Sequence, residues 1–146
     1  MIREAVASDL DALLALYLHL HETRLPEDGA RLRAAWAQIM ADANRHLLVC
    51  ELDGRIVASC DCVIVPNLTR GARPYALIEN VVTHADFRRR GCATACLNRA
   101  REIAREAGCY KIMLMTSAKD AGTLAFYRRA GFDDSEKTAF IQRLED

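Results

Sequence analysis

Apolar residues recur at helical spacing between Gly91 and Ala107, and the pattern there has no exception. The positions that follow the i, i+3, i+4, i+7 spacing are Cys92, Ala93, Cys96, Leu97, Ala100, Ile103, Ala104 and Ala107. This spacing is typical of an amphipathic helix that turns one face toward a core. Gly108 follows directly and is the expected C-terminal cap.

Three other stretches carry weaker helical patterns. The first runs from Leu10 to about His21, with Ser8 in a capping-box-like position before it. The second covers residues 32–40, and a short third helix is expected over residues 121–130, where Gly131 would end it.

Strand patterns alternate with these helices. Two apolar runs, residues 46–52 and 55–65, flank the pair Asp53-Gly54, which favours a hairpin turn. Residues 74–84 are the most strand-like run. The remaining expected strands are residues 1–6, a buried strand at 110–117, and a last strand at 137–144.

The element order is strand-helix-helix-strand-strand-strand-helix-strand-helix-strand. It predicts an α/β (α+β) fold with a mixed, mostly antiparallel sheet of about six strands and helices on both faces. No repeat or linker interrupts the pattern, so residues 1–146 are expected to form a single domain.

Composition narrows the function classes. Of the 146 residues, 51% are hydrophobic, and the 20 basic side chains equal the 20 acidic ones. Because the net charge is zero, the protein as a whole is not expected to attract nucleic acid. The sequence shows neither a secretion signal nor an apolar run of membrane-spanning length, so the expected location is cytoplasmic, without membrane association.

Six cysteines are present, and free thiols are the expected state in a chain of this size and class. The spacings Cys60-x-Cys62 and Cys92-x-x-x-Cys96 lack the paired C-x-x-C pattern of structural zinc sites, so no metal is expected. None of the cysteines has a histidine placed recognisably as a base, and a cysteinyl intermediate is therefore not favoured.

Three consecutive arginines, Arg88 to Arg90, lie between the strand pattern at 74–84 and the helix that begins at Gly91. The start of a helix exposes backbone N–H groups that have no intrahelical partner, and such a turn binds anions. Gly91 and Ala93 leave room for a diphosphate, and Thr94 could add a hydroxyl donor. The alternative is a charge-rich helix start with solvated arginines.

Two motifs agree on one family. Arg88, Gly91 and Ala93 form an R-x-x-G-x-A pattern, and LAFYRRAGF follows on the helix after the next strand. This pairing resembles the GNAT superfamily of acyl-CoA-dependent N-acetyltransferases. The opening IREAVASDLDALLALY and the order of elements are similar to that family as well. The resemblance implies the family's fold and acetyl-CoA as cosubstrate, and it allows a homodimer.

The resemblance also assigns coenzyme-binding residues. Val81, Val82 and Thr83 would line the pantetheine arm through their main chain. The residues that would bind the pyrophosphate are Arg88, Arg89, Arg90, Gly91, Cys92, Ala93 and Thr94. Asp120 stands where the family often has an asparagine, and Lys119 beside it could reach the phosphates instead.

Amine acetylation needs a base, because deprotonating a lysine-like amine at pH 7 costs about 4.6 kcal/mol. Glu79 is the only acid in the strand pattern at 74–84, where the pattern predicts it to be buried, and it is the candidate base. The alternative is a glutamate on the solvated face or paired with an arginine. An oxyanion donor is expected from a backbone N–H near Val82, provided that the strand bulges.

Tyr127 occupies the family's general-acid position, from which a phenol could protonate the departing thiolate. Its alternative role is packing beside Phe126. The predicted activity is transfer of an acetyl group from acetyl-CoA to a primary amine of a small molecule or peptide, directly within a ternary complex. A noncatalytic acyl-CoA-binding or regulatory module is the alternative.

The acceptor should contact the loops at 23–29 and 66–73. In them, Arg24, Arg70 and Arg73 hint at an acidic acceptor, although solvated arginines would explain them as well.

Overall fold

A computed structural model of the chain describes residues 1–20, 24–27 and 29–145. The backbone divides into two compact units, Met1–Leu114 and Met115–Asp146, and each is described by itself. The predicted end of the first helix, near His21, lies outside the described residues. No helix in the described part of the chain has the length and apolar character needed to cross a membrane.

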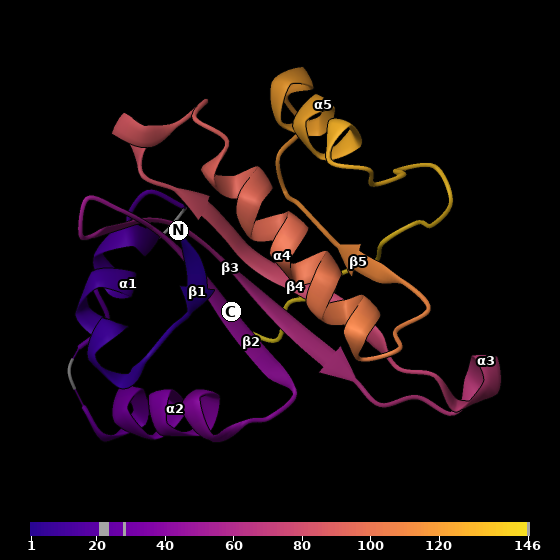
Figure 1. Ribbon diagram of the computed structural model, residues 1–146, viewed down its shortest axis with the longest axis horizontal. Helices are drawn as coiled ribbons and strands as arrows, with labels where there is room; N and C mark the ends of the chain where they lie inside the picture. The colour runs from indigo at the N-terminus through magenta and orange to yellow at the C-terminus, as the bar shows by residue number, and fades with distance from the viewer. Residues whose placement is uncertain (21–23, 28, 146) are drawn as a thin grey trace. The chain divides into compact units, whose positions relative to one another are not determined.

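The first unit contains a five-stranded sheet in the order β1-β2-β3-β4-β5 (Figure 1). The strands are β1 (Ile2–Glu4), β2 (Arg45–Leu52), β3 (Arg55–Val65), β4 (Tyr75–Thr83) and β5 (Ile112–Leu114). Neighbours pair antiparallel except β4 and β5, which pair in parallel. A parallel pair needs a crossover connection, and α4 (Cys92–Glu106) provides it. The predicted mixed, mostly antiparallel sheet is confirmed, with five strands in place of about six.

The β2–β3 hairpin turns at the two residues that the sequence indicated. Asp53 and Gly54 have φ angles of 50° and 76°. Two consecutive residues with positive φ form the turn whose twist matches that of antiparallel strands. The loop after β3 holds a short helical turn, α3 (Thr69–Ala72), where Arg70 and Gly71 have left-handed backbone angles.

Helices α1 (Leu10–Tyr17) and α2 (Ala30–Ala41) confirm two of the predicted helices. The start of α1 differs from the prediction, because a 3₁₀ turn (Ala7–Asp9) precedes it and Ser8 makes no cap. Asp9 takes that role: its carboxylate accepts a hydrogen bond from the Val6 N–H at 2.8 Å and pairs with Arg3 at 2.7 Å.

Helices cover both faces of the sheet. Leu47 and Val49 on β2 pack with Leu13 of α1 in a cluster that Trp36 of α2 also contacts. Side chains alternate along a strand, so Leu48 points to the other face, where it is fully buried. Helix α4 packs against β2, β3 and β4, and in Figure 1 it runs along the direction of β3 and β4.

Gly108 ends α4 as the sequence predicted. Its φ is 80°, its N–H donates to the Arg105 carbonyl, and the Cys109 N–H donates to the Ala104 carbonyl. A left-handed residue after the last turn satisfies carbonyls that would otherwise lack a donor.

The second unit contains α5 (Ala121–Arg129), which confirms the predicted short helix. The predicted last strand at 137–144 is wrong, because the described structure has no regular element there and leaves Phe140 91% exposed. An apolar β-branched or aromatic run favours a strand only where another strand pairs with it.

In the first unit, the strand expected at 110–117 is shorter than predicted, at Ile112–Leu114, and half-buried instead of buried.

Candidate functional site

A bulge interrupts β4 next to the candidate base. Ser59 of β3 lies opposite Val82, and Asp61 lies opposite Glu79. Between these pairs β3 has one residue, whereas β4 has two, Asn80 and Val81. Asn80 has a φ of 53°, in the left-handed region that asparagine tolerates better than most residues. A bulge leaves backbone groups outside the ladder, so the condition for an oxyanion donor near Val82 is met.

The turn into α4 has the features of an anion site. Gly91 is the N-cap, its φ is 79°, and it has no side chain to occupy the first N–H groups of the helix. A Cβ built at Gly91 would meet no atom within 4 Å. The first turn of α4 holds no acid, and the helical hydrogen bonds begin with the Ala95 N–H, which donates to the Gly91 carbonyl. The N–H groups of Cys92, Ala93 and Thr94 therefore precede the ladder, and N–H groups in this position of a helix favour an anion.

The three arginines before this turn have different surroundings. Arg88 donates to the His19 carbonyl at 3.4 Å, and the Arg90 guanidinium lies 5.0 Å from the centre of the Phe87 ring. Arg89 has a φ of 62°. All three side chains are exposed.

Three residues of β4 were predicted to line the pantetheine arm. Of these, Val81 and Thr83 are half-buried, and Val82 is 4% exposed. Cys92, at the start of α4, is buried and adjoins Cys50, whose pKa rises to about 11 through burial and its contact with Cys92. All six cysteines are free thiols. A hydrogen bond with Cys96 and burial raise the pKa of Cys60, and burial raises the pKa values of Cys62 and Cys109. Thiols with raised pKa values are poor nucleophiles, so the structure gives no support to a cysteinyl intermediate at Cys50, Cys60, Cys62 or Cys109.

Glu79 is exposed, so the prediction that it is buried is wrong. Alternation along β4 places Glu79 on the face opposite to the buried Ala76 and Ile78, so the apolar run around it does not bury it. Asp61, directly opposite, is the buried acid at 2% exposure, and Arg45 donates to both of its oxygens. Sequence reasoning missed Asp61, although an acid inside the apolar run 55–65 was a visible signal.

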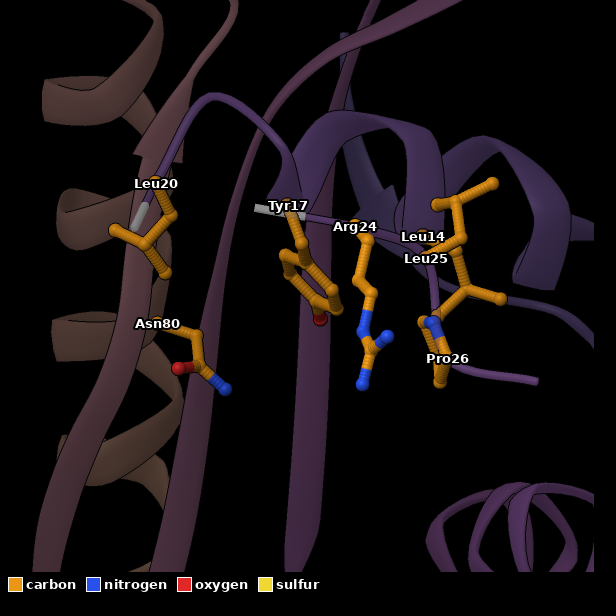
Figure 2. Close-up of a pocket in the computed structure, with 7 residues that line it drawn as sticks. All are labelled: Leu14, Tyr17, Leu20, Arg24, Leu25, Pro26 and Asn80. Carbon is orange, nitrogen blue, oxygen red and sulfur yellow. The ribbon is translucent and has the colours of Figure 1, made fainter. Parts of the chain in front are cut away.

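A pocket of about 250 Å³ opens beside the bulge (Figure 2). Its lining residues are Leu14, Tyr17, Leu20, Arg24, Leu25, Pro26 and Asn80. Asn80 brings the bulge to the pocket, and residues 24–26 belong to the loop that was predicted to contact the acceptor. Sequence reasoning missed Tyr17 and Asn80, because they lie far apart in the chain and only the folded sheet brings them together.

Tyr17 is mostly buried, and burial together with the nearby Asp61 raises the pKa of its phenol to about 12. In Figure 2 its ring lies between Asn80 and Arg24, with the hydroxyl pointing in the same direction as the Arg24 guanidinium.

The arginines of the other loop that was predicted to contact the acceptor, at 66–73, lie in a different environment. Arg70 and Arg73 lie 5.5 and 5.8 Å from the ring centre of Tyr110, and neither lines the pocket.

The second unit holds the remaining predicted site residues. Asp120 caps α5 by accepting a hydrogen bond from the Thr123 N–H at 2.9 Å, and this bond lowers the pKa of the Asp120 carboxyl. Lys119 beside it is exposed. Tyr127 is half-buried, with its ring centre 5.0 Å from that of Phe126 and 6.4 Å from that of Phe132. Within the described residues there is no group of three or more potential metal ligands.

Comparison with known proteins identifies the family. The model of the Acetyltransferase (GNAT) family matches residues 10–132. The chain is 36% identical over 141 residues to the glucosamine 6-phosphate N-acetyltransferase of Trypanosoma brucei brucei, covering 93% of this chain and 90% of that protein.

A second relative is described as an uncharacterized N-acetyltransferase of Methanocaldococcus jannaschii. It is 31% identical over 142 residues, which are 92% of this chain, and the match spans 61% of that relative's length. Among solved structures, a putative acetyltransferase from Agrobacterium tumefaciens matches with a TM-score of 0.90 and 38% identity, covering 98% of this chain and 99% of the other.

Proposed function

The chain belongs to the GNAT family of acetyltransferases and uses acetyl-CoA as cosubstrate, and from this premise we propose that it acetylates the primary amine of a small molecule by direct transfer within a ternary complex. The observation that carries this proposal is the bulge of β4 at Asn80, which lies between the strand residues proposed for the coenzyme and the pocket. At such a place an acyl group and an amine can meet.

The coenzyme would bind along the main chain of Val81, Val82 and Thr83 and at the turn from Arg88 to Thr94. The open space at Gly91 and the first N–H groups of α4 support the pyrophosphate position. Lys119 and Asp120 are proposed as neighbours of the coenzyme. The Asp120 carboxylate is engaged in the cap of α5, so Lys119 is the residue of the two that would contact the phosphates.

In the proposed reaction Glu79 accepts a proton from the acceptor ammonium, directly or through water. The amine nitrogen then attacks the acetyl carbonyl carbon, and the C–N bond forms. A backbone N–H near Val82 would stabilise the oxyanion. The C–S bond breaks, and Tyr127 donates a proton to the thiolate of coenzyme A. The nitrogen of the tetrahedral intermediate loses its second proton to the Tyr127 phenolate, directly or through water, so that a neutral amide forms and the phenol is restored. The role of Tyr127 rests on its place in the family pattern.

The first acceptor to test is an amino sugar phosphate, because the trypanosome relative at 36% identity is named for glucosamine 6-phosphate. Peptide amines, polyamines, amino acids and aminoglycosides complete the panel. We also propose a cytoplasmic location, which the free cysteines support, since free thiols persist in reducing compartments.

The test has two stages. Calorimetric titration with acetyl-CoA and with desulfo-CoA measures binding, and a mass-spectrometric amine panel then measures transfer. We expect acetyl-CoA to bind with a dissociation constant well below about 1 mM and at least one amine to be acetylated. Binding without turnover of any amine would instead favour the noncatalytic acyl-CoA-binding module. Mass detection is needed because a thiol-reactive dye would also react with protein cysteines.

A further inference from the structure

Among the described residues that line the pocket beside the bulge, one is charged, and that residue is a cation, Arg24. We propose that Arg24 recognises an anionic group on the acceptor, so that the enzyme selects amines that also carry a phosphate or a carboxylate. This inference rests on the proposed function and adds to it the residue that determines acceptor specificity.

Arg24 is available for a ligand. The structure gives it no ion pair or hydrogen bond within the described residues, 1–20, 24–27 and 29–145, and its side chain is exposed. In Figure 2 its guanidinium extends away from the loop into the pocket, past Leu14 and Leu25. An arginine with apolar neighbours and a free planar end suits bidentate contact with a carboxylate or phosphate. Arg70 and Arg73, by contrast, lie against Tyr110.

Tyr17 strengthens the preference for an anion. Its hydroxyl faces the same part of the pocket as the Arg24 guanidinium. Because its pKa is about 12, the phenol stays protonated at neutral pH and adds a donor without adding negative charge. The nearest buried acid, Asp61, is already paired with Arg45, so its charge is compensated within the protein.

The other side of the pocket suits the amine. Asn80 lines it there, and Glu79 is the preceding residue on β4. In the view of Figure 2, Asn80 and Arg24 lie on opposite sides of Tyr17. An acceptor would therefore place its amine toward Glu79 and its anionic group toward Arg24. The cavity of about 250 Å³ lies below the usual range of drug-sized sites, which favours a small metabolite over a peptide.

The experiment compares acceptors in pairs that differ only in the anionic group. One pair is glucosamine 6-phosphate and glucosamine, and the other is β-alanine and β-alaninamide, so the two pairs separate phosphate from carboxylate recognition. The readout is the ratio of kcat/KM for the anionic member to that for the neutral member. We expect a ratio of about 10 to 100 in one pair for the wild type, as for a charge-assisted hydrogen bond.

Arg24→Gln should bring this ratio close to one, and Arg24→Lys should restore part of it, because the charge remains but the planar fork is lost. Arg31→Gln removes an exposed arginine of α2 that does not line the pocket, and it should leave the ratio at the wild-type value. A ratio near one in the wild type, or a ratio that Arg24→Gln does not change, would overturn the role of Arg24 while leaving the acetyltransferase function standing. Binding of acetyl-CoA without acetylation of any acceptor would overturn the proposed function itself.

Discussion

Glu79 is the last residue of β4 before the bulge, exposed to solvent and opposite the buried Asp61. As the proposed base it accepts a proton from the acceptor amine. Glu79→Gln cannot accept that proton and should lower kcat/KM by about 100-fold or more. Acetyl-CoA affinity, measured by calorimetry, should not change.

Glu102→Gln is the matched control for this change. Glu102 is an exposed glutamate of α4 that pairs with Arg99 at 3.0 Å on the helix surface. Its loss should leave both rate and pH profile at wild-type values. If Glu79→Gln kept full activity across the pH range, the base would have to be sought elsewhere.

An ion pair beside the site joins the buried Asp61 to the half-buried Arg45. Arg45→Met removes the partner of Asp61, which is 2% exposed, and leaves an uncompensated charge in the sheet. The free energy of unfolding should fall by about 3 kcal/mol or more. The exposed pair of Arg99 and Glu102 provides the comparison, since Arg99→Met should cost less than about 1 kcal/mol. Urea unfolding measures both, and equal losses would contradict the assignment.

At the scale of elements, Asp9 joins α1 to the first strand through Val6 and Arg3. The hydrogen bond from Arg3 lowers the pKa of Asp9 below its ordinary value of 3.8. A lowered pKa stabilises the fold above the ordinary value, and this stabilisation is lost as the pH falls through the lower, folded-state value. Asp9→Asn should therefore be about 1–3 kcal/mol less stable than the wild type at pH 7.

The difference between wild type and Asp9→Asn should stay constant from pH 7 to about pH 5 and shrink below about pH 4. Asp86→Asn changes an exposed acid of the 3₁₀ turn after β4 and serves as the control, with no comparable acid dependence. A difference that persisted undiminished at low pH would show that the Asp9 carboxylate charge is not what stabilises α1.

The turn into α4 can be tested with two glycines in equal backbone conformations. Gly91 and Gly54 have φ angles of 79° and 76°, and a Cβ at either would meet no atom within 4 Å. Gly91→Ala and Gly54→Ala should each destabilise the fold by about 1 kcal/mol through backbone strain. Only Gly91→Ala should weaken acetyl-CoA binding, and Gly91→Glu should abolish it. Retained affinity in Gly91→Glu would place the pyrophosphate elsewhere.

Local patterns predicted the elements but not their partners. The helical spacing from Gly91 to Ala107 and the pair Asp53-Gly54 identified α4 and the hairpin, because the residues that determine each are neighbours in the chain. The prediction of a strand at 137–144 was wrong, because a strand also needs a neighbouring strand to pair with, and a local pattern does not show whether one is present. The pocket could not be predicted for the same reason, because Tyr17 and Asn80 line it together only after the sheet has formed. The bulge at Asn80 also depends on how β4 is paired in register with β3.

At the scale of the whole molecule, the sequence predicts one domain over residues 1–146. The family match at 10–132 includes residues of both compact units, and the single domain stays a prediction. Trp36, the single tryptophan, reports on the first unit, and hydrogen exchange of the α5 amides reports on the second. If the prediction holds, both probes should give the same unfolding midpoint in urea.

The two unfolding midpoints can also be compared in the presence of acetyl-CoA. At about 100 times its dissociation constant, a ligand that binds only the folded state adds about 2.7 kcal/mol to the free energy of unfolding. We expect acetyl-CoA to raise the urea midpoint of unfolding by the same amount whether it is measured by Trp36 fluorescence or by hydrogen exchange of α5. The reason is that all parts of a single domain unfold together. Gly91→Glu, which should not bind the coenzyme, provides the control and should show no shift with either probe. A shift confined to Trp36 would mean that α5, and Tyr127 with it, unfolds independently of the coenzyme site, and both the single domain and the proposed general acid would then be wrong.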